Sequence, residues 1–352
     1  MMNKTSHQNY VAIAKALVIM LMVVGHSGCP EIVLKTIYLF HMPFFFICSG
    51  LFFTPPADIA KLKSFTIRKI KGVYLPFLEW CLPFILLHNV FYALNLYNGE
   101  FGYNGSVSHV LTGNEMIHNI KLNIVLMDGI PQLLGGFWFL KDLFFALLFM
   151  GVITFFIKVN TMRMKLLFLA ILFATSIILG YLPMSFYFIP ARDLFWSSTF
   201  LYSGYLLKDL RLSRNIIIVS AIIFITGVII PHHLDFFSVK IGMIVFYFTA
   251  MTGTILTLKF SHKLEELKAI RGFFYYAGEH TLVILGLHFL SFKLVSLMII
   301  YVEGLTIAHL AEFPVIANHV MYSPIYMLFG VLLPLVVYYF YSSLCCKWIK
   351  RE

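Results

Sequence analysis

The sequence predicts an all-α polytopic membrane protein with about ten transmembrane helices and both termini in the cytoplasm. Hydrophobic residues make up 60% of the 352 positions and charged residues only 12%, whereas soluble domains contain roughly 25% charged residues. The apolar residues form runs of about 20, the length that crosses a bilayer core. Basic residues collect in alternate gaps between these runs, as the positive-inside rule requires.

Ten apolar segments have approximately this length. Their limits are about 10–28, 33–53, 73–95, 134–157, 165–182, 191–207, 214–231, 237–258, 272–301 and 320–345. The first segment contains a lysine, ends in a histidine and is followed at once by another apolar segment. We therefore interpret it as a retained helix, not as a secretory signal.

The basic residues set the expected orientation. Nineteen of the 26 lysines and arginines lie in the even-numbered gaps and at the two ends of the chain, which places those parts in the cytoplasm. The net charge of +10 is spread over these short gaps, so it indicates membrane topology and not a nucleic-acid partner. Homo-oligomerisation is left open.

We expect one domain over residues 1–352, with no appended soluble domain. The longest gap, about 96–133, is expected outside the cell, and its segment Val107 to Met127 is predicted to form an interfacial helix or a lid. The five cysteines show no CxxC spacing, so neither a disulfide framework nor a metal site is expected.

Ionisable residues interrupt the first two segments. Lys15 and His26 are eleven positions apart, which on a helix brings them to one face about 16 Å apart. His41 opens the second run in the sequence Phe40-His41-Met42-Pro43. Such groups are costly in membrane segments and mark functional sites, although Lys15 has the alternative of reaching the inner interface.

Five further polar residues are predicted to form an outer-half site. On the expected topology they lie near the outer ends of later segments, and they are Lys141, Asp142, Arg192, Asp193 and His288. The alternative for each adjacent pair of opposite charges is mutual neutralisation inside a packed bundle.

Four motifs resemble the membrane-bound acyltransferase-3 family, which includes fucose 4-O-acetylase-like and O-antigen acetylase-like proteins. They occur in the family's order across nearly the whole chain. The motifs are Lys15 with Gly25-His26, Phe40-His41-Met42-Pro43 with Ser49-Gly50, Gly136-Phe137-Trp138-Phe139-Leu140, and Gly278-Glu279-His280-Thr281 with Leu287-His288.

This resemblance implies transfer of an acyl group, usually acetyl from acetyl-CoA, to a sugar hydroxyl of a surface or exported glycan. The resemblance also implies that His26 corresponds to the family's proposed catalytic histidine. We expect the protein to lie in the bacterial inner membrane. Many members carry arginine where this chain has Lys15, which supplies a point charge without a bidentate fork.

The chemistry of acyl transfer gives the other candidates their roles. His26 is the expected general base, because imidazole titrates near neutral pH, and Asp142 or Asp193 would orient its ring. Acceptor or oxyanion contacts are expected from His41, Trp138, Lys141, Arg192 and His288.

The donor is expected to enter from the cytoplasm. Phosphates of coenzyme A would meet basic side chains there, and Lys15 would contact the donor deeper in the bundle. The expected phosphate contacts are Arg68, Lys69, Lys71 and Arg271.

A secondary transporter or glycan exporter is the main alternative function, because it would need the same buried charges. No inverted repeat of the first two segments is evident in the second half of the chain, which disfavours it. A non-catalytic membrane partner in polysaccharide synthesis is a weaker alternative.

Overall fold

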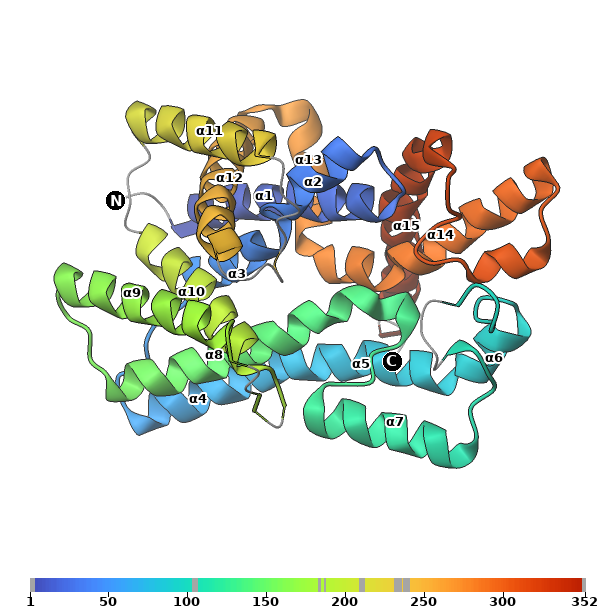
Figure 1. Ribbon diagram of the computed structural model, residues 1–352, viewed down its shortest axis with the longest axis horizontal. Coiled ribbons are helices and arrows are strands. Elements are labelled where there is room, and N and C mark those ends of the chain that lie inside the picture. Colours follow the sequence, from blue (N-terminus) through green and yellow to red (C-terminus); the bar gives the residue numbers. More distant parts are fainter. Residues whose placement is uncertain are drawn as a thin grey trace.

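Every regular element of the protein is helical within the residues that the structure describes. The computed structural model describes residues 4–102, 107–182, 185–186, 188–208, 213–230, 236 and 241–349, and Figure 1 shows the arrangement of the helices. The elements are α1 (Lys4–His26), α2 (Glu31–Tyr38), α3 (His41–Leu51), α4 (Ile59–Lys69), the π-helix η1 (Ile70–Tyr74), α5 (Leu75–Leu86), α6 (His88–Ala93), α7 (Gly113–Leu126), the 3₁₀-helix η3 (Gln132–Phe137), α8 (Trp138–Phe156), α9 (Met162–Leu179), α10 (Ala191–Leu207), α11 (Arg214–Ile229), α12 (Ile241–Glu266), α13 (Lys268–Glu279), α14 (Thr281–Glu303), the 3₁₀-helices η4 (Ile307–Ala311) and η5 (Val320–Tyr322), and α15 (Ser323–Ile349).

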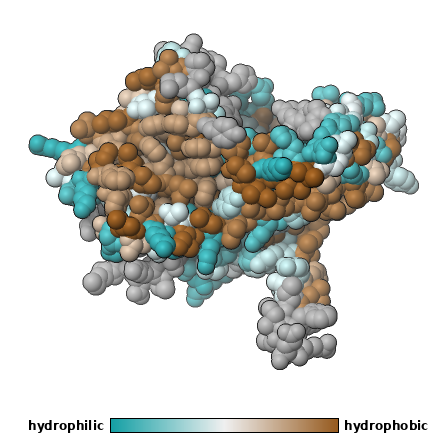
Figure 2. All heavy atoms as spheres, turned by 90° about the horizontal axis from the view of Figure 1, so that it is seen from below, coloured by the Kyte–Doolittle hydropathy of each residue, from teal (hydrophilic) through white to brown (hydrophobic). Residues whose placement is uncertain are grey.

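Seven helical stretches in the described ranges are long and apolar enough to cross a membrane, which confirms a polytopic membrane protein. Each overlaps one of the ten predicted segments. They are Asn9–His26, Glu31–Leu51, Gln132–Phe156, Met162–Leu179, Gly242–Glu266, Thr281–Glu303 and Val320–Leu344. Figure 2 shows hydrophobic side chains across the middle of one face and hydrophilic ones along its borders.

The other three predicted segments are helical but shorter than a full span. Helices α10 and α11 contain 17 and 16 residues. The segment predicted over 73–95 is divided between α5, with 12 residues, and α6, with six. Pro83 inside α5 removes a backbone donor. The structure thus supports seven full-length spans, fewer than the ten predicted.

The segment predicted as one helix over 272–301 is broken at His280, which separates α13 from α14. The backbone of His280 leaves the helical region at φ −113° and ψ 28°. Its ring Nδ1–H donates to the carbonyl oxygen of Tyr276 at 2.7 Å, which is the acceptor that its own backbone N–H would use in a continuous helix. Such competition between side chain and backbone ends helices.

A similar break separates α2 from α3 within the second span. Phe40 has φ −148° and ψ −18°, and the ring Nδ1–H of His41 donates to the carbonyl oxygen of Ile37 at 3.0 Å. The break turns the start of α3 toward α1 and positions His41 beside the interior of the bundle.

Helix α3 is fixed to α10 by direct contact between their backbones. A Cβ atom on Gly50 would lie 1.9 Å from the carbonyl oxygen of Leu201, and one on Gly204 would lie 2.0 Å from that of Ile47. Only glycine permits this approach. Helix α1 packs in turn against α3, α12, α13, α14 and α15, so it lies inside the bundle with α3 at its side.

The predicted helix between Val107 and Met127 is present as α7, but it does not cover the cavity described below. Thr112 and Glu115 form a capping box at its start, the arrangement that satisfies the first free N–H groups of a helix. The hydroxyl of Tyr74 donates to the carbonyl oxygen of Ile124 at 2.6 Å. Helix α7 therefore lies along α5 (Figure 1), and the lid interpretation is not supported.

Candidate active site

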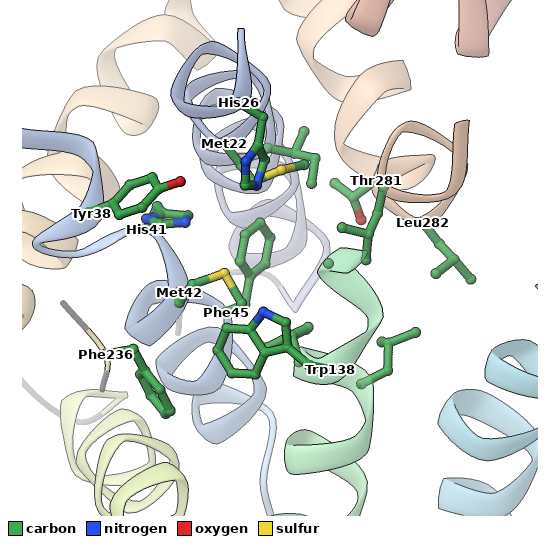
Figure 3. Close-up of a pocket in the computed structure, with 15 residues that line it drawn as sticks. Met22, His26, Tyr38, His41, Met42, Phe45, Trp138, Phe236, Thr281 and Leu282 are labelled. Atoms are coloured by element: carbon green, nitrogen blue, oxygen red, sulfur yellow. The ribbon is translucent and has the colours of Figure 1, made fainter. Parts of the chain in front are cut away.

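A cavity beside His26 is the centre of the candidate active site. Its volume is about 300 Å³, at the lower end of the roughly 300–1,000 Å³ typical of ligand sites. Figure 3 shows its labelled side chains converging on one space. The cavity is lined by Ile19, Met22, His26, Tyr38, His41, Met42, Phe45, Gly136, Trp138, Phe139, Leu140, Phe236, Thr281, Leu282 and Leu285.

All four sequence motifs contribute to this lining. His26 ends α1, His41 begins α3, Trp138 begins α8 and Thr281 begins α14. Segments more than 200 positions apart in the sequence therefore meet at helix ends around one space. The break in the second predicted segment places His41 at the start of α3, and the break in the ninth places Thr281 at the start of α14. Both residues thereby reach the cavity.

One face of α1 forms a wall of the cavity. Ile19, Met22 and His26 line it at intervals of three and four residues, the spacing of a single helix face. Lys15 lies four residues before Ile19 and continues this stripe, and its ammonium is 4.0 Å from the carboxylate of Glu279 on α13. The predicted stripe is present, with an apolar section between its two polar ends.

His26 is held by aromatic contacts alone. Its ring centroid is 5.6 Å from that of His288, 5.1 Å from that of Phe289 and 6.3 Å from that of Tyr38. Within the described part of the chain, neither of its ring nitrogens forms a hydrogen bond. The half-buried imidazole lines the cavity with neither nitrogen committed to a hydrogen bond in the described residues.

His41 and Tyr38 form the wall opposite Thr281 and Leu282 (Figure 3). Their rings are 4.9 Å apart. Because a carbonyl oxygen only accepts, the contact with Ile37 places the proton of neutral His41 on Nδ1 and leaves a lone pair on Nε2. Tyr38 was not singled out from the sequence, although its position three residues before His41 would have indicated a shared face.

His288 is fully buried on α14 and does not line the cavity. Its Nδ1 lies 3.1 and 3.0 Å from the carbonyl oxygens of Ile284 and Leu285, so this nitrogen also carries a proton. Its Nε2 is buried and has no hydrogen-bond partner. The structure places His288 behind His26, not at the cavity surface where the predicted acceptor or oxyanion contact would require it.

The two candidate carboxylates lie away from His26. Neither Asp142 nor Asp193 lines the cavity. Arg192 Nε donates to Asp193 at 2.7 Å, and Lys141 forms an ion pair with Asp128 at 3.2 Å. Asp142 is 7% exposed on α8, within electrostatic range of Asp193.

A charged cluster, here called the Arg192 cluster, consists of Asp128, Lys141, Asp142, Arg192 and Asp193. It contains two ion pairs, Lys141 with Asp128 and Arg192 with Asp193. The structure does not bring either carboxylate to His26, and it does not bring Lys141 or Arg192 to the cavity wall. Among the described residues, no three His, Cys, Asp or Glu side chains are arranged to hold a metal ion.

The predicted phosphate contacts lie on two separate stretches of the chain. Arg68 and Lys69 end α4, where Arg68 donates to the Ser64 hydroxyl at 2.8 Å and Lys69 lies over the Phe65 ring. Burial, together with the charge of Arg68, lowers the pKa of Lys69. Lys71 follows in η1, and Arg271 lies in the first turn of α13. Helix α4 packs on α8, whereas α13 packs on α1.

Comparison with known proteins identifies the family. A sequence model of the acyltransferase domain, acyltransferase 3, matches residues 8–339, which include the four motifs and every residue that lines the cavity. No curated protein and no solved structure matches the chain. The match extends over nearly the whole sequence and agrees with the helical membrane architecture. The chain belongs to the acyltransferase 3 family.

Proposed function

We propose that this protein is a membrane O-acyltransferase that moves an acetyl group from cytoplasmic acetyl-CoA to a hydroxyl of a cell-envelope or exported glycan. The family implies acyl transfer. The acetyl donor, the glycan acceptor, the bacterial inner membrane as the location and His26 as the base are our proposals.

The observation that carries the proposal is the state of His26. His41, His280 and His288 each commit Nδ1 to a backbone carbonyl oxygen, whereas His26 commits neither nitrogen and lines the cavity. A general base needs a lone pair within reach of the proton that it removes. His26 meets this requirement without breaking an existing hydrogen bond.

The reaction then proceeds by proton transfer and addition. His26 takes the proton of the acceptor hydroxyl while the oxygen attacks the thioester carbonyl carbon and forms a C–O bond. Collapse of the tetrahedral intermediate breaks the C–S bond, and imidazolium His26 returns the proton to the departing thiolate. General-base catalysis of this kind is typically worth about 10²- to 10⁴-fold in rate.

The walls of the cavity suit the two substrates. Most lining side chains are apolar, an environment that disfavours water and so suppresses competing hydrolysis of the thioester. The indole of Trp138 offers a flat surface for a sugar ring, and the hydroxyls of Tyr38 and Thr281 offer donors for a developing oxyanion. Lys15, at the other end of the α1 stripe, is the proposed contact for a polar group of coenzyme A.

The test measures transfer of labelled acetyl from acetyl-CoA to purified envelope glycans in proteoliposomes. We expect His26→Ala to abolish transfer above background while the protein inserts and melts like the wild type. His118→Ala is the matched control, because His118 is an exposed histidine on α7 away from the cavity, and it should transfer normally.

Two outcomes would contradict the proposal. Transfer by His26→Ala at the wild-type rate would remove the catalytic role of His26. Movement of glycan across the membrane by the wild type, with no transfer or hydrolysis of acetyl-CoA, would favour the exporter alternative.

A further inference from the structure

The neighbour of His26 across the bundle is another histidine and not a carboxylate. The rings of His26 and His288 have centroids 5.6 Å apart and planes inclined by 30°. His288 is 0% exposed, and the rings of Phe289 and Phe292 pack around it. His288 does not line the cavity, and His26 is the cavity residue whose ring lies beside it.

The tautomer of neutral His288 is fixed by its own helix. Two carbonyl oxygens accept from Nδ1, so neutral His288 has its lone pair on Nε2 and can only accept a hydrogen bond there. That Nε2 has no partner in the described structure. Buried acceptors without partners are uncommon in folded proteins, and each calls for an explanation.

We propose that His288 is a positioning residue that accepts a hydrogen bond from His26 during the reaction. This inference rests on the proposed role of His26 as the base. One nitrogen of His26 holds its proton toward His288 Nε2, which leaves the lone pair of the other nitrogen directed into the cavity. The chain of contacts runs from the α14 carbonyls through His288 to His26 and then to the acceptor hydroxyl.

The separation of the two rings leaves room for a hydrogen bond between them. Two imidazole rings joined edge to edge by an N–H···N bond of about 2.9 Å have centroids roughly 5 Å apart. The observed 5.6 Å is longer than this, so the bond requires the His26 ring to turn until one of its N–H groups faces Nε2. Catalytic hydrogen bonds are often longer without substrate and tighten when it binds.

A neutral partner also suits the surroundings. Phe289 and Phe313 pack against each other beside this pair, with ring centroids 4.5 Å apart, so the environment of His288 is apolar. Burying a carboxylate there without a cation would be costly, whereas neutral imidazole requires only hydrogen-bond partners. His288 can therefore fix the tautomer of His26 and stabilise its protonated form, the two tasks of the third group in a catalytic triad.

Two substitutions at His288 separate positioning from packing. The amide of Asn in His288→Asn can still donate to the helix carbonyls but does not reach the place of Nε2. The longer His288→Gln can place an acceptor oxygen near the Nε2 position. We expect His288→Asn to lower kcat by at least about tenfold, a typical effect of losing a group that orients a functional histidine, with the KM for acetyl-CoA nearly unchanged.

His288→Gln should recover most of the lost kcat. Ser291→Ala is the matched control, since Ser291 is buried on α14 and bonds only its own helix, at Leu287. It should keep wild-type kcat. Nitrogen-15 NMR of labelled histidine should show one tautomer of His26 in the wild type and in His288→Gln, and a mixture in His288→Asn.

The inference is overturned if Asn and Gln at position 288 give equal kcat, or if the tautomer of His26 is the same in both. A purely structural role would also lower the melting temperature of both variants in parallel. This failure is distinct from failure of the proposed function, because His26→Ala tests the base independently.

Discussion

The cavity at His26 and the Arg192 cluster differ in whether their polar side chains have hydrogen-bond or ion-pair partners. Around His26 the contacts are aromatic, and both imidazole nitrogens stay available. In the Arg192 cluster, Asp193 is bonded to Arg192 and Lys141 to Asp128. A general base needs an uncommitted lone pair, whereas buried charges are stabilised chiefly by a partner of opposite charge. The cavity therefore suits catalysis, and the cluster suits structural support.

The largest expected effect comes from the cavity. His26→Gln keeps a polar side chain of similar size but removes the titratable base, so kcat should fall by about 10²- to 10⁴-fold. Single-turnover measurement of acetyl transfer, with the melting temperature as the control, checks this. If kcat falls less than tenfold, the contrast between the two regions is broken.

The Arg192 cluster should respond in stability instead. Asp193→Asn leaves Arg192 without its main counter-charge, and breaking a buried ion pair typically costs about 3–5 kcal/mol. We expect a lower melting temperature in detergent, with kcat per folded molecule nearly unchanged. Replacing both partners, as in Arg192→Met with Asp193→Leu, should restore much of the stability. A stable Asp193→Asn protein with a lowered kcat would instead support a catalytic role for Asp193.

A smaller effect is expected at the inner end of the α1 stripe. Lys15→Met should raise the KM for acetyl-CoA about tenfold, equivalent to roughly 1.4 kcal/mol. The substitution removes the ammonium group proposed to bind a polar group of coenzyme A. Glu279→Gln is the control, since it removes the same 4.0 Å ion pair but keeps the cation. If both variants raise KM equally, Lys15 acts through the ion pair alone.

The smallest effect is expected at Glu115, a paired carboxylate that faces water. Hydrogen bonds from the backbone and hydroxyl of Thr112, and then from His109, lower its pKa from 4.5 to about 2. Because the folded pKa lies below the unfolded one, the stabilisation is complete above pH 4.5 and is lost as pH falls toward 2. The protection factors of amides at the start of α7, which compare the observed with the intrinsic exchange rate at each pH, should fall over this window in the wild type and stay constant in Glu115→Gln.

Several parts of the fold follow from local sequence. Of the ten apolar runs predicted to span the membrane, seven overlap helices of full span length, and the eleven-residue interval between Lys15 and His26 predicted one face of α1. The helix α7 was also expected between Val107 and Met127. These features depend on hydropathy and helix periodicity, which short stretches of sequence encode directly.

The helix breaks and the pairing of charges could not be predicted in this way. His280 and His41 interrupt helices because their rings take backbone acceptors, and composition alone does not show that choice. Lys141 was placed beside Asp142 by sequence, but its ion pair is with Asp128, on the loop before η3. Distant segments decide such contacts, as they do for His26 and His288.

The backbone contact between α3 and α10 bears on how relatives of this protein should be compared. Gly50 belongs to the second motif, yet its lack of a side chain serves helix packing, since any Cβ there would collide with the carbonyl oxygen of Leu201. Relatives that share this glycine therefore share the packing of α3 on α10, which says nothing about the ligand that they bind. Sorting them by the ligand of the cavity requires the residues that line it, such as Tyr38, Met42 and Trp138.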